Sequence, residues 1–230
     1  PAGKGTEPLY LGCHEGNDFK ITVRNLSEAD LAIFKKNCDE FRANHFRFTN
    51  YFDSQRFSSN NAEVGKLLLK KDFRKAAELI SGYPEIASHL EGQKNDYVGA
   101  LKELPKKTLM LYVHSYQSLL WNRMAEKLSG REIMLPLIGF GTEINDESIA
   151  KMAEEVLKEE GITQRDFIIR QLPVSAEGSE RSLSAAAKDF KASEAGEDEL
   201  NKGMSKIILS FSLQKGSYAT IVVKNLFQPK

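Results

Sequence analysis

Residues 50–57 hold the side chains best suited to chemistry on a nucleic-acid base. Their sequence is Asn-Tyr-Phe-Asp-Ser-Gln-Arg-Phe, and they follow a run, His45 to Thr49, that alternates like a strand. An enzyme that modifies a base must take it out of the stack, and an aromatic side chain then replaces the lost stacking. That stacking contributes about 1–3 kcal/mol per base. An alternative interpretation is that Tyr51, Phe52 and Phe57 are core residues beside a turn.

The two ends of the chain carry the strand signals. Residues 19–24 alternate apolar and polar side chains, as a half-buried strand does. We expect a preceding strand at residues 9–12 and a turn at residues 14–17. Ser27 with Asp30 resembles a capping box that opens a helix. Residues 207–213 alternate again and predict a strand near the C-terminus.

The middle of the chain is patterned for helices. Apolar residues recur at helical spacing from residue 61 to residue 80, from about 107 to 128, and from 149 to 157. Residues 174–203 are rich in Ser, Ala, Gly and Glu and predict a loop or weak helix. Strands at both ends around a helical middle predict an α+β fold, with a helical module inserted into a sheet-based domain.

The net charge is zero, but it is unevenly distributed. Residues 143–199 hold seven Lys and Arg against fifteen Asp and Glu, whereas residues 200–230 hold five basic and no acidic side chains. A polyanion would therefore favour the parts of the chain outside 143–199. The simpler interpretation is that these are solvated faces without a partner.

Several classes of protein are disfavoured. No apolar run approaches the ~18 residues that span a bilayer, and the first residues lack the pattern of a signal peptide. Two cysteines, Cys13 and Cys38, without paired spacing indicate a reducing compartment and no cysteine metal site. The four histidines lack metal-ligand spacing, so we expect no metal. The Gly139-Phe140-Gly141 stretch lacks the residues of a nucleotide-binding motif and predicts a turn.

Four stretches together resemble the TruD family of pseudouridine synthases. Residues 50–57 are similar to the family's Asn-Tyr-Phe-Gly-x-Gln-Arg-Phe-Gly signature, and residues 9–24 to its Leu-Gly-x-x-x-Gly-Asn-x-Phe strand pair. Residues 114–122 are similar to the helix with the Gln-Ser-x-x-Phe-Asn core, and residues 213–220 to the Leu-Pro-x-Gly-Ser-Tyr-Ala-Thr element. The four occur in family order and span nearly the whole chain.

The resemblance implies a fold and an activity. The fold would be a pseudouridine-synthase-type sheet domain, residues 1–74 and 200–230, interrupted by a mainly helical TruD-specific module, residues 75–199, whose helix 107–129 could pack on the catalytic domain. The activity would be conversion of a uridine of tRNA, position 13 in the D arm, to pseudouridine without metal or organic cofactor. The expected protein is a cytoplasmic monomer that binds tRNA.

The resemblance also implies roles for particular residues. Asn50 and Phe52 would line the active site, with Phe52 stacked on the target uracil. RNA contacts are expected from four residues: Gln55, Arg56, Gln117 and Lys215. On one helix Ser118 and Asn122 share a face whereas Gln117 points partly away, so we expect some of these side chains to brace the catalytic loop. For Gln55 and Arg56 the alternative is a structural network within the loop, and for Lys215 a solvated turn.

The sequence departs from the family pattern at its most important point. The essential aspartate of the family lies in a Lys-Asp-x-x-Ala-x-Thr-x-Gln motif upstream of the strand pair, and that motif is absent here. We therefore expect sequence to be missing upstream of Pro1 and the chain by itself to be inactive. Two alternatives are a short homologue that binds RNA without modifying it, and a rebuilt site in which Asp53, where the family has Gly, is the carboxylate. A protein-interaction scaffold is a third function class, and it would show no salt-dependent tRNA binding.

Overall fold

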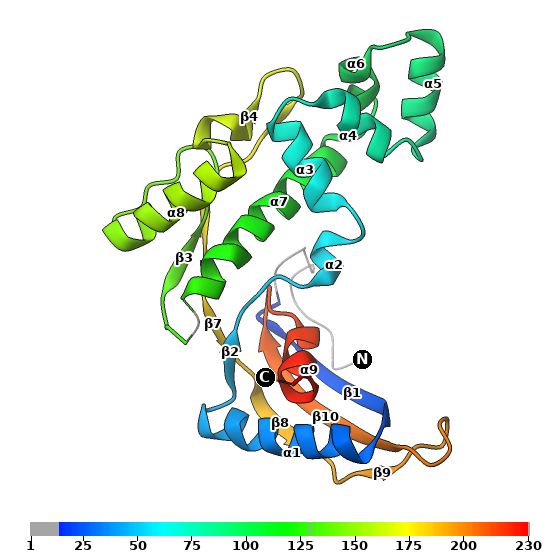
Figure 1. Ribbon diagram of the computed structural model, residues 1–230, viewed down its shortest axis with the longest axis vertical. Helices are drawn as coiled ribbons and strands as arrows, with labels where there is room; N and C mark the ends of the chain where they lie inside the picture. The colour runs from blue at the N-terminus through cyan, green and yellow to red at the C-terminus, as the bar shows by residue number, and fades with distance from the viewer. Residues whose placement is uncertain (1–13, 129, 230) are drawn as a thin grey trace, which may run out of the picture. The chain divides into compact units, whose positions relative to one another are not determined.

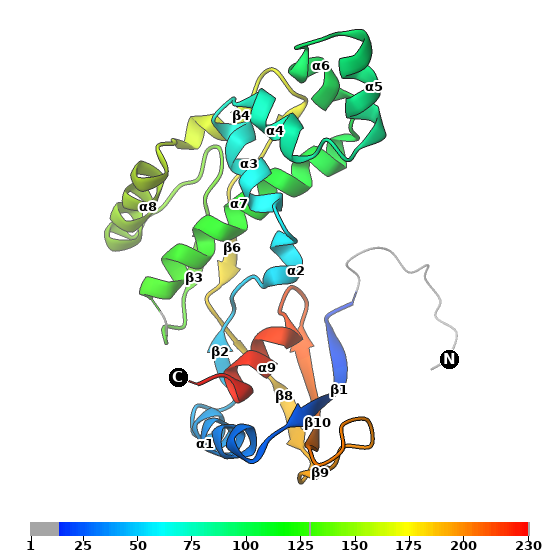
Figure 2. The ribbon, with the colours of Figure 1, turned by 45° about the vertical axis from the view of Figure 1, so that its right-hand side comes forward.

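The computed structural model describes residues 14–128 and 130–229, so the strand expected at residues 9–12 lies outside the described residues. The chain divides into two compact units, which Figures 1 and 2 show in two views. Unit 1 combines the residues up to Tyr51 with those from Ser184 onward, and unit 2 is the continuous stretch Phe52–Leu183. The mixture of helices and antiparallel sheets confirms the predicted α+β class.

Unit 1 is built on a sheet of β1 (Gly16–Leu26), β10 (Ser205–Gln214) and β8 (Lys188–Ala192), with β9 (Gly196–Glu197) paired to the start of β10. β1 and β10 are antiparallel, and Phe19 lies opposite Phe211. The two strands predicted at opposite ends of the chain are therefore direct neighbours. A second pair joins β2 (Arg47–Thr49) to β7 (Ser184–Ala186).

The turn predicted at residues 14–17 is wrong in its second half, because Gly16 and Asn17 already belong to β1. A Cβ on Gly16 would lie 2.3 Å from the carbonyl oxygen of Leu213. Because glycine has no Cβ, it permits this close approach of the β10 backbone, which is one of the reasons that a glycine occurs within a strand.

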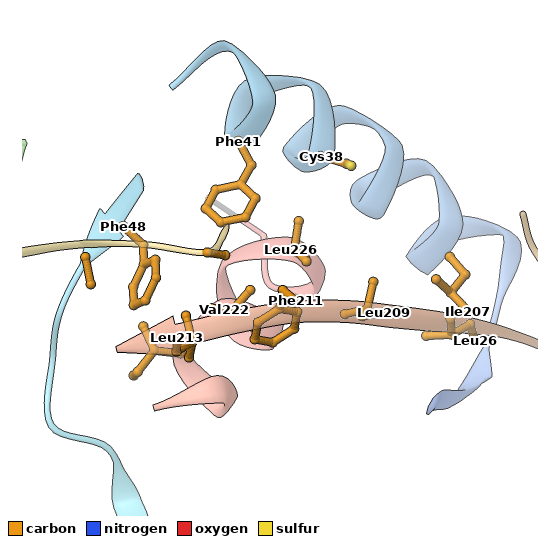
Figure 3. Close-up of a cluster of buried hydrophobic side chains, with 13 residues drawn as sticks. Leu26, Cys38, Phe41, Phe48, Ile207, Leu209, Phe211, Leu213, Val222 and Leu226 are labelled. Carbon is orange, nitrogen blue, oxygen red and sulfur yellow. The ribbon is translucent and has the colours of Figure 1, made fainter. Parts of the chain in front are cut away.

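The core of unit 1 lies between its sheet and two helices, α1 (Glu28–Ala43) and α9 (Ala219–Phe227). Ser27 and Asp30 form the predicted capping box at the start of α1. Figure 3 shows Phe41 and Cys38 of α1, Leu209 and Phe211 of β10, and Val222 of α9 converging on one apolar cluster. Burial of these side chains holds the strand pair and both helices together.

Residues 174–203, predicted to be loop or weak helix, form five short strands instead. These are β5 (Val174–Ser175), β6 (Ser179–Ser182), β7, β8 and β9. Their small polar residues have little strand propensity, and pairing with apolar partner strands overrides it. One signal was present in the sequence, because Leu183, Ala185 and Ala187 are all buried and recur with period two.

Unit 2 is organised around α7 (Lys106–Lys127). Its other α-helices are α2 (Ser54–Phe57), α3 (Asn61–Leu69), α4 (Phe73–Leu79), α5 (Pro84–Gly92), α6 (Tyr97–Lys102) and α8 (Glu147–Glu160). β3 (Met134–Leu137) pairs with β6, and a 3-10 helix, η1 (Gln164–Phe167), leads into β4 (Ile168–Ile169), which pairs with β5. In Figure 1, α7 runs through the middle of this unit beside α3.

The helix predicted from residue 61 to residue 80 is in fact two helices. Lys71 adopts a left-handed backbone conformation, φ +62°, between α3 and α4, and the carboxylate of Asp72 accepts a hydrogen bond from the Lys75 amide at the start of α4. The break places Lys71 at the lining of a groove of unit 2. The predicted helices at 107–128 and 149–157 correspond to α7 and α8.

The units divide at residues 51–52 and 183–184, whereas the sequence suggested boundaries at 74–75 and 199–200. The difference has two structural reasons. α3 packs on α7, so closely that a Cβ on Gly65 would lie 2.1 Å from the Tyr112 carbonyl oxygen, and it therefore belongs to unit 2. β7, β8 and β9 pair with strands of unit 1.

Across residues 14–128 and 130–229, none of the helices combines the length and the apolar character that crossing a bilayer requires.

The central strand of unit 1 offers a direct test of its core. Leu209 is fully buried on β10, so Leu209→Ala should lower the free energy of unfolding by about 2–5 kcal/mol, through lost burial and a residual cavity. Leu200 is 72% exposed and is the matched control; its replacement by Ala should change stability by less than about 0.5 kcal/mol. Urea denaturation measures both, and equal effects would contradict the packing described.

Candidate active site

The segment 50–57 begins in unit 1 and ends in unit 2. Asn50 follows β2 and is 3% exposed, and Asp53, just before α2, is also buried. Phe52 and Arg56 are half-buried, whereas Gln55 is exposed. Within this segment the solvent-exposed side chains are therefore on α2, whereas the Asn50 side chain is buried in protein.

Asn122 of α7 holds the backbone of Phe52 at both of its polar atoms. Its Nδ2 donates to the Phe52 carbonyl oxygen at 2.8 Å, and its Oδ1 accepts from the Phe52 amide at 2.9 Å. A side-chain amide that pairs with a peptide group in this way replaces the ladder bonds that a neighbouring strand would supply. Phe52 is thereby fixed although it lies outside any sheet.

One turn earlier on α7, two serines hold Arg56. Ser118 Oγ accepts a hydrogen bond from Arg56 Nε at 3.1 Å and donates to the His114 carbonyl oxygen at 2.8 Å. Ser115 Oγ lies 3.0 Å from the Arg56 carbonyl oxygen, to which it can donate. The Ser118–Asn122 face of α7 thus braces residues 52–56, which is the arrangement that their spacing predicted.

The ring of Phe52 lies among one aromatic and two cationic side chains. Trp121 meets it at 89° with the centroids 5.6 Å apart. The guanidinium carbon of Arg181 lies 4.0 Å from the Phe52 centroid and 5.3 Å from the Trp121 ring, and that of Arg56 lies 5.7 Å from Phe52. Such interactions between a cation and a ring are worth about 0.5–1 kcal/mol where exposed and more where desolvated.

Arg181 is the residue that sequence reasoning missed. It lies on β6, within the segment predicted to be loop, and reaches Phe52 only because β6 pairs with β3 beside α7. Its position 129 residues along the chain from Phe52 leaves no local pattern to identify it. Because its guanidinium covers one face of Phe52, a base stacking on that ring must use the other face or displace Arg181.

Gln117 is buried against backbone groups of two other segments of unit 2. It is 4% exposed, and its Nε2 donates to the carbonyl oxygens of Ile138 and Glu177 at 3.0 and 3.1 Å. Trp121 Nε1 donates similarly to the Leu135 carbonyl oxygen. Trp121 therefore supports β3 itself, and Gln117 supports the residues just beyond the Leu137–Ser179 end of the β3–β6 pair. Gln117 offers its amide to protein rather than to solvent.

Lys215, in unit 1, is exposed on the turn that follows β10. Its backbone amide donates to the Glu15 carbonyl oxygen at 2.9 Å, which extends the β1–β10 pairing. The following Gly216 has φ +84°, so the turn requires a left-handed residue at that position. The RNA contact assigned to Lys215 stays a prediction, as do those of Gln55, Arg56 and Gln117.

His114 of α7 is a titratable group with a displaced pKa. Burial lowers the pKa of its imidazole, and the positive charge of Arg56 lowers it further. His114 is therefore neutral at pH 7. Among the residues that the structure describes, no group of three or more His, Cys, Asp or Glu side chains could hold a metal ion.

Comparison with known proteins identifies the family. The family model described as tRNA pseudouridine synthase D (TruD) matches residues 1–89, 84–133 and 127–226. The chain belongs to the TruD family. A protein named probable tRNA pseudouridine synthase D from Methanosarcina mazei is 29% identical over 96% of this chain and 70% of its own length. A protein named probable tRNA pseudouridine synthase D 2 from Methanocaldococcus jannaschii is 30% identical over 95% of this chain and 68% of its own length.

A solved structure agrees with the fold. The crystal structure of a putative tRNA pseudouridine synthase D from M. mazei superposes with a TM-score of 0.79 at 28% identity, covering all of this TruD-family chain and 72% of that one. The sequence alignment with the M. mazei protein spans 312 positions, more than the 230 residues here. That relative therefore has residues inside the aligned span for which this chain has no counterpart.

The lowered pKa of His114 predicts a specific pH dependence of stability. Between the native pKa and the unfolded value of about 6.5, the unfolded chain binds more protons than the native one, so stability rises with pH. The contribution is complete above about pH 6.5 and is lost as the pH falls below it. Urea denaturation from pH 5 to pH 8 should show a steeper acid loss for the native sequence than for His114→Gln. Identical profiles would show that His114 is not desolvated.

Proposed function

We propose that this protein is a tRNA pseudouridine synthase that isomerises a uridine of tRNA, at position 13 of the D arm, without a cofactor. Family membership and the names of the relatives support the activity. The observation that carries the proposal is the anchored Phe52. It is an aromatic ring held at its backbone by Asn122 and flanked by Arg181 and Trp121, within the segment that matches the family signature.

The reaction explains why such a ring is needed. Breaking the bond between N1 of the uracil and C1′ of the ribose, rotating the base and joining its C5 to C1′ conserves every atom; C5 loses a proton and N1 gains one. The base must leave the helical stack to turn over. A flat apolar ring keeps the detached base in the pocket without fixing its rotation by hydrogen bonds, which is the role we assign to Phe52.

The other residues receive supporting roles in this proposal. Asn50 lines the active site near the target ribose or the catalytic carboxylate. Gln55, Arg56 and Lys215 contact RNA, and Arg181 sets the orientation of Phe52 and adds positive charge beside it. For Gln117 the geometry favours an indirect part, because its amide holds residues 138 and 177.

The catalytic carboxylate is not assigned. No stretch of the 230 residues matches the Lys-Asp-x-x-Ala-x-Thr-x-Gln motif in full. We therefore propose that this chain by itself forms no product. The same observation favours the alternative function, a homologue that binds tRNA without modifying it. Robust product from this chain alone would make Asp53 the candidate carboxylate, and Asp53→Asn would then have to abolish it.

The two units suggest a division of labour. We propose that unit 1 holds the sheet of the catalytic domain, and that unit 2, organised around α7, is the family-specific module and also carries Phe52 and Arg181. The expected protein acts as a monomer in the cytoplasm, where its proposed substrate is found.

The decisive experiment is pseudouridine detection in an unmodified tRNA transcript treated with the protein expressed from its complete reading frame. Product at position 13, and none in a transcript with cytidine there, is the expected result. Binding of the transcript without product would favour the alternative. Loss of both would remove the RNA function altogether.

Phe52→Ala separates a pocket wall from a core residue. It should lower kcat/KM by about 5- to 150-fold, the equivalent of about 1–3 kcal/mol of stacking, with little change in thermal midpoint. Phe167 is fully buried in the same unit, and its replacement by Ala should instead cost about 3–5 kcal/mol of stability.

The role of Arg181 is tested in the same assay. Arg181→Lys keeps the charge but loses the planar group over the ring, so kcat should fall although salt-dependent binding of tRNA is retained. If Phe52→Ala unfolds the protein or leaves turnover intact, Phe52 is a core residue and the site assignment fails. Unchanged kcat in Arg181→Lys would remove Arg181 from the site.

A further inference from the structure

A second concave surface of unit 2 gathers cations around an exposed aromatic ring. The groove has a volume of about 520 Å³, and three segments far apart in the sequence form it. They are the α3–α4 turn, the loop after β3, and the stretch from η1 to the β4–β5 connection; in Figures 1 and 2, β4 lies beside α3. The lining residues are Lys71, Phe140, Arg165, Asp166, Ile168, Arg170 and Gln171.

Phe140 is presented to solvent on a fixed backbone. Its amide donates to the Ala176 carbonyl oxygen at 2.8 Å, and its own carbonyl oxygen accepts from the Gly178 amide at 3.3 Å. Gln117 holds the adjoining residues 138 and 177 from beneath. The side chain is nevertheless 43% exposed. Full burial of a phenylalanine contributes about 1.5–3 kcal/mol, and the exposed part of this ring forgoes a share of it, so its exposure on a rigid support supports a binding role.

The groove is lined mainly by positive side chains, although residues 143–199, which supply most of its lining, carry an excess of negative charge. The groove is lined by three cations, Lys71, Arg165 and Arg170, and one carboxylate, Asp166, which accepts from the Thr163 amide and hydroxyl at 2.8 and 2.9 Å. Lys71 lies 4.0 Å from that carboxylate. Arg165 and Arg170 are exposed and make no ion pair within residues 14–128 and 130–229.

The expectation that a polyanion would avoid residues 143–199 therefore does not apply to this surface. The acidic side chains of that segment are numerous in the sequence, but the fold gathers two of its arginines with a lysine from outside it. A locally positive concave surface attracts phosphate even on a neutral protein.

We propose that this groove binds an unpaired segment of RNA, with one base stacked on Phe140 and the backbone phosphates against Arg165 and Arg170. Guanidinium groups bind phosphate through paired hydrogen bonds, and aromatic rings accept any base because every base has a flat face. The exposed amide of Gln171 offers both a donor and an acceptor to a base edge. An acidic peptide would use the cations but would have no use for the ring, so the combination favours RNA.

This inference takes its ligand class from the proposed function, but its residues are separate from those around Phe52. The groove adds a binding surface for the tRNA at a place where no chemistry occurs. It therefore contributes to affinity and to the choice of RNA rather than to the isomerisation itself.

The test is the affinity of the 230-residue chain for a fluorescein-labelled, unmodified tRNA transcript across a series of salt concentrations. The double variant Arg165→Ala and Arg170→Ala should lower the magnitude of the slope of log K against log salt by about 0.7–0.9 for each phosphate that is no longer neutralised. The matched double change to Lys should keep that slope. Phe140→Ala should weaken binding by about 5- to 150-fold at an unchanged slope.

Arg74→Ala is the control, because it removes an exposed cation of the same unit that pairs only locally, with Glu78. It should leave both affinity and slope unchanged, and all variants should keep the thermal midpoint because the altered side chains are exposed. Equal behaviour of Phe140→Ala and Arg74→Ala would overturn the proposal. So would displacement of the tRNA by poly-glutamate as effectively as by unlabelled tRNA, which would identify a general anion surface.

The outcome is distinguishable from failure of the proposed function. If the variants lose binding as expected but the protein from the complete reading frame forms no pseudouridine, only the synthase proposal fails. If pseudouridine forms and the groove variants bind and turn over normally, only the groove proposal fails.

Discussion

The structure of unit 2 depends on polar side chains of one buried helix that satisfy backbone groups of other segments. α7 sends Asn122 to the peptide of Phe52, Gln117 to Ile138 and Glu177, and Trp121 to Leu135. Buried backbone donors and acceptors need partners, and outside helices and sheets they must find them on side chains. The buried positions of α7 therefore include amide and hydroxyl side chains, whereas a helix that contributes only hydrophobic packing would bury apolar side chains alone.

This arrangement links the two surfaces proposed to meet RNA. One face of α7 fixes Phe52 and Arg56, and another fixes the residues that flank Phe140. A rigid helix can hold separated binding residues at constant spacing, as recognition of a folded RNA requires. The two aromatic rings have features in common, since each is exposed or half-buried, belongs to a site that includes arginine, and has a backbone held by hydrogen bonds.

The elements with a clear apolar periodicity could be predicted from the sequence. The short strands that lack this periodicity, and that form only by pairing with partners distant in the sequence, could not. α7, α8 and the β1–β10 pair follow their apolar patterns closely, and the spacing of Ser118 and Asn122 correctly indicated a bracing face. The strands between residues 174 and 197 carry Ser, Ala and Glu, so their structure depends on partners distant in the sequence. Arg181 and the cationic groove were missed for the same reason, because folding alone brings their residues together.

The central claim is that α7 holds Phe52 in place through Asn122, and hydrogen exchange at the Phe52 amide tests it most directly. Asn122→Ala removes the oxygen that accepts from that amide. The account predicts faster exchange at Phe52, by about 5- to 150-fold for the removal of about 1–3 kcal/mol of stabilisation, with unchanged exchange in the β1–β10 pair. Unchanged exchange at Phe52 in the variant would show that another part of the protein holds this residue and would contradict the account.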